Sequence, residues 1–185
     1  MLDTFNEERY PIIKNLIKGT DLATRFMFAE QPLIRSLRLT LFAFFIKLYP
    51  VRKKINVLLS ETQYNYEHSS IVSEHWNNSN GFKAGDRVPN EILSIQDKKI
   101  FLFDLLQGTS SIILIFSSSP QAVLLKKQMA HFAKAYIVSR DSRVYESFGL
   151  YEGVYIIRPD GYVGFRADFL DTDGCVHYFD TILKK

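Results

Sequence analysis

Two short apolar runs, one on each side of a segment with helical spacing, constrain the fold more than any other feature of this sequence. Residues 111–116 read SIILIF and residues 135–138 read AYIV. Both runs are rich in β-branched residues and have the length of strands that are buried on both faces. Residues 120–134 between them repeat apolar side chains at helical spacing. The sequence therefore predicts a strand–helix–strand unit.

The residues that follow this strand–helix–strand unit predict further helices and strands. Ser142–Phe148 is a candidate short helix, and Phe179–Leu183 is a candidate C-terminal helix. Val154–Ile157 and Tyr162–Phe165 flank Pro-Asp-Gly, which is typical of a hairpin turn. Alternating strands and helices followed by a hairpin favour an α/β domain with a mixed sheet, as in thioredoxin-like proteins. We assign residues 85–185 to this domain.

Residues 1–60 have helical patterns instead. Thr4 and Glu7 have the form of a capping box, which predicts a helix start. Pro11 would kink or restart that helix. Gly19 is a plausible end, and Thr20-Asp21 a plausible new start. We therefore expect an interrupted helical segment at the N-terminus.

A further helix is expected from Pro32 to Tyr49, with one apolar face, and a shorter basic helix over residues 51–59. In the helix from Pro32 to Tyr49, the longest run without a charged residue is Leu39–Ile46, which is far shorter than the roughly 20 apolar residues that span a membrane. This helix either packs on the protein's own core or lies as a basic amphipathic helix on a membrane surface.

Polar residues, Asn and Gly dominate residues 61–84 without visible periodicity, so we expect a linker there. The charge distribution also divides the chain. Residues 1–60 carry a net charge of +5 and residues 61–185 carry −2. The predicted organisation is a helical segment over residues 1–60, a linker over residues 61–84, and the α/β domain.

Composition excludes several classes of protein. Hydrophobic residues make up 46% and charged residues 23% of the 185, which is typical of globular proteins and not of disordered chains. Cys175 is the single cysteine, so an intramolecular disulfide, a CxxC pair and a four-cysteine zinc site are excluded. The first residues lack the apolar core of a signal peptide, so we expect a cytoplasmic protein.

Thioredoxin-like redox proteins place their reactive cysteine after the first central strand, where the helix N-terminus lowers the thiol pKa. Here that position reads Ser117-Ser118-Ser119-Pro120, and a hydroxyl cannot carry out thiol–disulfide exchange. A plain helix cap is the favoured interpretation, with anion binding by the helix amides as the alternative. A peroxiredoxin-like role for Cys175 has little support, because it lies far from this position.

No metal or nucleotide site is predicted. Glu67-His68 and Glu74-His75 repeat within the expected linker, while His131 and His177 are isolated. Neither GxGxxG nor GxxxxGK[ST] occurs, so the chain lacks the sequence elements that hold a dinucleotide or a nucleoside triphosphate. Arg52-Lys53-Lys54 is too short a basic run to indicate nucleic-acid binding.

Four segments in order resemble the C-terminal thioredoxin-like domain of phenol hydroxylase-type FAD-dependent aromatic-ring monooxygenases. They are AGDRVP at residues 84–89, FLFDLL at residues 101–106, SIILIF, and RPDGYVGFR at residues 158–166. Residues 2–11 resemble the segment that follows the last FAD-contacting motif of these enzymes. The resemblance covers almost the whole chain but only about the last third of such an enzyme.

The resemblance implies that this chain is the C-terminal portion of a larger hydroxylase. FAD and NAD(P)H are implied for the full-length family, whose FAD motifs would precede Met1, and no catalytic, cofactor-binding or metal-binding residue can be assigned in this chain. Its matching motif residues are expected to be structural: Gly85, Asp86, Arg87, Pro89, Asp104, Arg158, Pro159, Asp160, Gly161 and Arg166.

In that family the domain has lost redox chemistry and is associated with dimer contacts and with covering the FAD domain. The implied partners are an FAD-binding domain, or a separately encoded equivalent, and a second copy in a homodimer. The alternative is a stand-alone thioredoxin-like interaction module. Its basic amphipathic helices would dock on a protein partner or an anionic membrane surface.

Overall fold

The computed structural model describes residues 2–28, 64–77 and 80–182. The chain divides into two compact units, residues 5–64 and residues 65–185 together with residues 1–4. The helices predicted over residues 32–49 and 51–59 lie outside the described residues.

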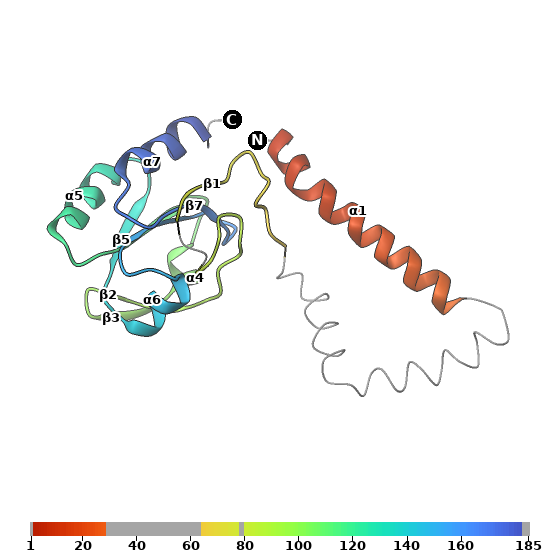
Figure 1. The fold of residues 1–185 in the computed structure, drawn as a ribbon, viewed down its shortest axis with the longest axis horizontal. Coiled ribbons are helices and arrows are strands. Elements are labelled where there is room, and N and C mark those ends of the chain that lie inside the picture. Colours follow the sequence, from red (N-terminus) through yellow and green to blue (C-terminus); the bar gives the residue numbers. More distant parts are fainter. Residues whose placement is uncertain (1, 29–63, 78–79, 183–185) are drawn as a thin grey trace. The chain divides into compact units, whose positions relative to one another are not determined.

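Helix α1 (Leu2–Met27) runs without interruption through Pro11 and Gly19 (Figure 1). The predicted break is therefore wrong. Spacing places Pro11 on the charged face of the helix with Glu7 and Lys14, and both Pro11 and Glu7 are exposed. Proline has no N–H to donate to the Glu7 carbonyl four residues earlier. Because this face is exposed, water can bond to that carbonyl instead, and the helix continues. The helix also begins before Thr4, so Thr4 is not its cap.

Thr20 was expected to start a new helix and instead lies within the existing one. Its hydroxyl donates a hydrogen bond to the carbonyl of Leu16 over 2.8 Å. Spacing places four large apolar residues of α1 on one face, and this face is exposed: Ile13 at 50%, Leu16 at 45%, Ile17 at 62% and Met27 at 59%.

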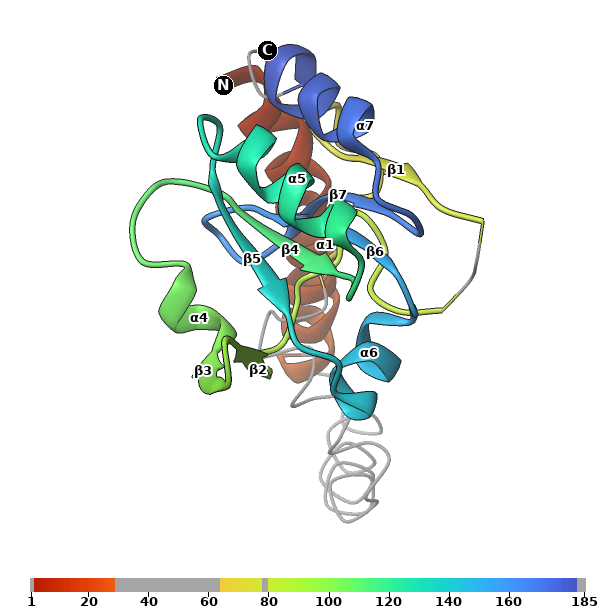
Figure 2. The same ribbon diagram turned by 90° about the vertical axis from the view of Figure 1, so that its left-hand side faces the viewer.

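The second unit is built on a five-stranded sheet in the order β1-β7-β6-β4-β5 (Figure 2). β4 and β5 are parallel, β6 is antiparallel to both β4 and β7, and β1 is parallel to β7. The sheet is therefore mixed, as predicted. Its strands are β1 (Ser73–His75), β4 (Ile112–Phe116), β5 (Lys134–Val138), β6 (Gly153–Ile157) and β7 (Val163–Ala167).

A separate antiparallel hairpin is formed by β2 (Ile92–Ile95) and β3 (Lys98–Phe101). Gln96 and Asp97 at its tip have φ of 49° and 62°, which is the left-handed pair that a tight two-residue hairpin requires. The short helix α4 (Leu102–Leu105) follows directly.

The helices of this unit are α5 (Pro120–Met129), α6 (Ser142–Phe148) and α7 (Thr172–His177), the last continuing as a π-helical turn over Tyr178–Ile182. α6 has the predicted bounds because both ends are capped. The Asp141 side chain accepts a hydrogen bond from the Arg143 amide, and Gly149 takes the left-handed conformation with φ of 71°. α5 ends five residues before Lys134, which belongs to β5.

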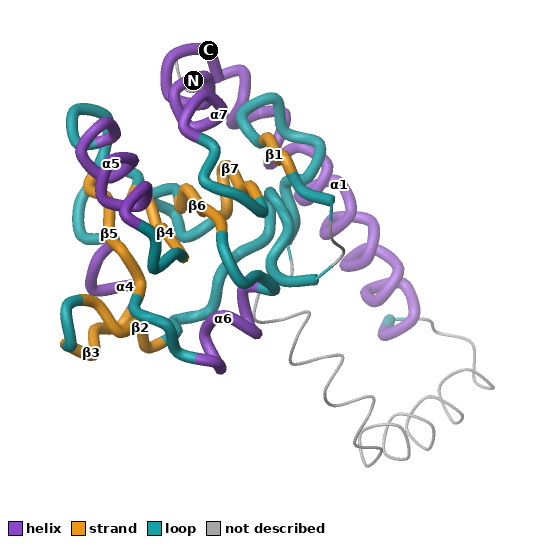
Figure 3. The backbone as a smooth tube through the Cα atoms, turned by 60° about the vertical axis from the view of Figure 1, so that its left-hand side comes forward, coloured by secondary structure: helices purple, strands orange, loops and turns teal. Residues whose placement is uncertain are grey.

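Strand β4 is buried along its whole length because the sheet is covered on both faces. Ile113 and Ile115 pack with α5 and α7, whereas Leu114 and Phe116 pack with α6 and the β2–β3 hairpin. This explains the continuous apolar run in the sequence. Figure 3 shows the strands as one layer, with α5 and α7 beside it. The predicted class, a mixed α/β domain with an N-terminal helix, is confirmed.

Candidate functional site

Arg166 on β7 is a buried arginine that joins three points of the preceding chain. Its side chain is 2% exposed, and its Nε donates to Glu74 Oε2 over 2.7 Å. Its Nη1 donates to the carbonyls of Phe82 at 3.0 Å and Asn80 at 3.3 Å. The guanidinium lies 4.4 Å from the centre of the Trp76 ring, a cation–π distance. These contacts occupy the arginine, so its role here is to hold Glu74, Trp76 and residues 80–82 against the sheet.

Tyr155 reinforces the same attachment from the neighbouring strand β6. Its hydroxyl lies 3.1 Å from the carbonyl of Phe82 and 2.7 Å from that of Phe148. Burial raises the pKa of this phenol above its usual range. Tyr155 is therefore a protonated hydrogen-bond donor in the interior.

The two glycine-containing motifs singled out in the sequence lie against each other. The Gly85 amide donates to the Val163 carbonyl over 2.8 Å, and the Val163 amide donates to the Asp86 carbonyl over 2.9 Å. The Val88 amide donates to the Gly161 carbonyl over 3.0 Å. AGDRVP thus runs along the start of β7 and the turn before it, although about 75 residues of sequence separate the motifs.

The Asp86 carboxylate fixes the loop around it. It accepts hydrogen bonds from the Lys83 amide over 2.7 Å and from the side-chain amide of Asn65. Arg87 is joined to Tyr162 by a backbone bridge, and its side chain is exposed, as are Pro89 and Asp104.

The Pro-Asp-Gly turn forms as predicted. The Gly161 amide donates to the Arg158 carbonyl over 2.9 Å, which closes the turn over Pro159. The buried Arg158 side chain pairs with Asp160 over 2.7 Å, and its guanidinium lies 5.7 Å from the centre of the Tyr66 ring. The motif residues therefore form two local clusters, one around the turn and Asp86 and the other around Arg166.

The serine cluster at the N-terminus of α5 contains a residue pair that the sequence did not indicate. The Ser117 hydroxyl contacts Glu152 Oε1 at 2.5 Å and Ser119 Oγ at 3.0 Å, and it accepts the Ser119 amide over 3.1 Å. Glu152 lies 35 residues away and reaches Ser117 because Gly153, the next residue, pairs with Phe116. The contact could have been predicted only from the register in which β4 pairs with β6, which the sequence does not reveal. The arrangement ties the loop after β4 to the start of β6.

Cys175 lies in α7 and is fully buried. Burial, with a smaller effect of the Asp171 carboxylate, raises the pKa of its thiol to about 12. A thiol that is buried and protonated at neutral pH is not a nucleophile, so the peroxiredoxin-like interpretation has no structural basis.

The two Glu-His pairs have different surroundings. His75 Nδ1 lies 2.5 Å from Asp171 Oδ2, whereas Glu74 pairs with Arg166. His68 lies 3.5 Å from Glu67 at the surface. Among the described residues no group of three His, Cys, Asp or Glu side chains could hold a metal ion.

No helix in the described part of the chain is long and apolar enough to cross a membrane. No protein-family model matches the sequence, and no curated protein sequence matches it.

Solved structures do match. CabE, an aromatic hydroxylase from angucycline biosynthesis, has a TM-score of 0.64 at 21% identity over 89% of this chain and 32% of its own. OxyS, the anhydrotetracycline hydroxylase from Streptomyces rimosus, has a TM-score of 0.65 at 19% identity over 90% of this chain and 32% of its own. The chain shares its fold with part of these enzymes. The rebeccamycin biosynthetic enzyme RebC, solved with reduced flavin, gives 0.64 at 18% identity over 97% of this chain and 36% of its own.

These matches agree with the family resemblance noted in the sequence at the level of the fold. The chain spans about a third of the length of each of these three enzymes.

Proposed function

We propose that this chain is the C-terminal portion of an FAD-dependent aromatic-ring hydroxylase of the phenol hydroxylase type. The observation that carries the proposal is the shared fold, which covers 89–97% of this chain in CabE, OxyS and RebC. The four sequence motifs support the same assignment, because they depend on residue identity and order rather than on the fold.

The proposed role is structural rather than catalytic. The strand order β5-β4-β6-β7, with β4 and β5 parallel, supports a thioredoxin-like domain, and in such a domain Ser117, directly after β4, would take the place of a redox cysteine. FAD and NAD(P)H would bind to the remainder of the enzyme, since the sequence lacks a glycine-rich dinucleotide motif. The domain would support dimer contacts and cover the FAD domain in the cytoplasm.

The proposed partner is an FAD-binding domain, on the same polypeptide or separately encoded. The exposed apolar face of α1 supports a partner, because exposed apolar patches of this kind mark interaction surfaces. A second copy of the chain is the other proposed partner.

The test has two parts. The purified chain is mixed with FAD and passed through a gel-filtration column, and we expect flavin absorbance to separate from the protein. Flavin that stays with the chain would contradict the non-catalytic role. NAD(P)H consumption with phenol as substrate should also be absent.

The second part measures the size of the endogenous protein with an antibody to residues 85–185. A band much larger than 21.5 kDa supports a domain of a complete hydroxylase. A band near 21.5 kDa would argue against one continuous polypeptide, and the FAD-binding partner would then be sought by co-purification.

A stand-alone interaction module is the second candidate, and the same face of α1 supports it. The charges of α1 balance, with four acidic and four basic residues between Leu2 and Met27. This balance favours a protein partner over an anionic membrane. Capture of a partner by the intact chain, lost when Ile13 and Ile17 are both replaced by Asn, would support this candidate.

A further inference from the structure

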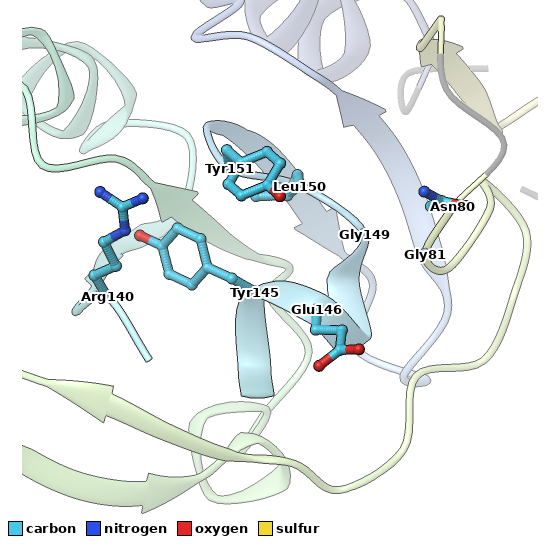
Figure 4. Close-up of a pocket in the computed structure, with 8 residues that line it drawn as sticks. All are labelled: Asn80, Gly81, Arg140, Tyr145, Glu146, Gly149, Leu150 and Tyr151. Carbon is cyan, nitrogen blue, oxygen red and sulfur yellow. The ribbon is translucent and has the colours of Figure 1, made fainter. Parts of the chain in front are cut away.

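An open pocket of about 950 Å³ lies outside the carboxyl end of β5, next to α6 (Figure 4). Tyr145 and Tyr151 provide its aromatic surface, and Arg140 and Glu146 provide charges of opposite sign. Figure 4 shows the two charged side chains on opposite sides of the Tyr145 ring.

Tyr145 is a fixed part of this pocket. Its hydroxyl donates to the Val138 carbonyl over 3.2 Å, and its ring packs edge-on against Phe116 with 5.2 Å between ring centres. Burial raises the pKa of Tyr145, so the hydroxyl stays protonated and neutral. Tyr145 is 5% exposed, so it forms a rigid, uncharged part of the pocket floor and leaves little ring surface open.

Tyr151, in contrast to Tyr145, is exposed to solvent. It is 87% exposed, the highest exposure among the large hydrophobic side chains of the described residues. Its ring gains little from folding in this position. An exposed aromatic ring beside a pocket is available for stacking with a planar ligand.

Arg140 supplies a free positive charge at the same place. It lines the pocket and lies close enough to Tyr145 for its charge to act on that hydroxyl, and Figure 4 shows its guanidinium near the Tyr145 hydroxyl. It makes no ion pair with any acidic side chain in the described part of the chain. An unpaired guanidinium has a planar set of donors that matches a carboxylate.

The position on the sheet agrees with these features. In open α/β sheets, ligands bind in the crevice beyond the carboxyl ends of parallel strands. β4 and β5 are parallel neighbours in the sheet, and Arg140 follows the last residue of β5 by two positions.

We propose that this pocket binds a small aromatic carboxylate. The carboxylate pairs with Arg140, and the ring stacks on Tyr151 above the buried Tyr145. Glu146 disfavours a second negative charge and so selects a monoanion. This site is separate from the proposed hydroxylase role, since it needs neither FAD nor the remainder of that enzyme.

The experiment is an NMR titration of the isotope-labelled full chain with benzoate. We expect saturable shifts of the amides at residues 140–151, with a dissociation constant of about 1 mM because the pocket is open to water. Benzamide, which lacks the charge, and cyclohexanecarboxylate, which lacks the aromatic ring, should each bind more weakly.

Two matched variants locate the site. Arg140→Gln should weaken benzoate binding about tenfold or more, as expected for loss of a charge-assisted hydrogen bond. Arg143→Gln is the control, because Arg143 is equally exposed but lines a different pocket, and it should leave binding unchanged. Tyr151→Leu should weaken benzoate binding and leave cyclohexanecarboxylate binding nearly unaffected.

Several results would overturn the proposal. They are an absence of saturable shifts up to the solubility limit of benzoate, equal effects of the two arginine variants, or shifts centred on another part of the chain. Because both arginines are exposed, their variants should give native spectra away from the pocket, and this checks that a loss of binding is not a loss of folding. None of these results bears on whether the chain carries FAD.

Discussion

Arg166 and Glu74 form an ion pair of 2.7 Å between β7 and the edge strand β1, although 92 residues separate them in the sequence. The arginine is 2% exposed and the glutamate 44% exposed. The pair therefore links a charge inside the sheet to one at its rim.

Replacement of Arg166 by Met should lower the free energy of unfolding by about 2–3 kcal/mol, because the carbonyls of Asn80 and Phe82 lose a charged donor. Urea unfolding measures the change. Arg87→Met is the control, since Arg87 is exposed, and its effect should stay within about 0.5 kcal/mol. Equal losses in the two variants would show that Arg166 does not anchor Glu74, Trp76 and residues 80–82.

Two glycines should respond differently to replacement by alanine. Both have positive φ, 87° at Gly85 and 83° at Gly161. A Cβ at Gly85 would lie 2.5 Å from the backbone of Tyr66 and Glu67, whereas at Gly161 the nearest atom is Phe103 Cε1 at 3.9 Å. Gly161→Ala should therefore cost only the conformational strain of about 1 kcal/mol. Gly85→Ala should cost clearly more, and thermal unfolding of both variants compares them.

Ser117→Ala should destabilise the protein by about 1 kcal/mol, because the hydrogen bonds to Glu152 and to the Ser119 amide are lost. Ser118→Ala, at an exposed neighbouring position, should have almost no effect. Chemical denaturation distinguishes the two. If both variants match the parent protein, the Ser117–Glu152 contact does not stabilise the loop.

Stability should fall as the pH rises above the ordinary pKa of cysteine, and Cys175 should account for part of this fall. Its thiol has a pKa of about 12 in the folded protein, whereas an unfolded thiol titrates near pH 8.5. Within this window the unfolded chain binds fewer protons than the folded chain, so a rise in pH favours unfolding. Below it the contribution is fully present.

The check is urea unfolding at about pH 7 and about pH 10. Cys175→Ala should lose less stability between these two values than the parent protein does. The thiol should also react with a maleimide only after unfolding. A folded chain that reacts rapidly at neutral pH would contradict the raised pKa.

Local signals predicted the α/β half of the fold well. Helix α6 has the predicted bounds because Asp141 and Gly149 cap it through neighbouring residues, and the Pro159–Gly161 turn closes on its own backbone. Features that depend on distant partners were missed. β1 is three residues long and exists only by pairing with β7, so periodicity cannot reveal it.

The errors in α1 have a different origin. Pro11 and Gly19 each disfavour a helix locally, and the prediction treated Pro11 as a kink or restart and Gly19 as an end. In a helix of 26 residues these local costs are outweighed by the turns on either side. The Ser117–Glu152 contact could not be predicted either, because it depends on the register of β4 with β6.

The parallel pairing of β1 with β7 determines where this protein can be shortened. A version that begins at Ala84, where the recognisable motifs start, would lack β1, Glu74 and Trp76. β7 would then become the rim of the sheet, with unpaired backbone groups and a buried arginine without its counter-ion. Such a rim is a template for pairing with other chains. The shortened version should therefore aggregate, whereas one that begins at Asn65 keeps the rim closed.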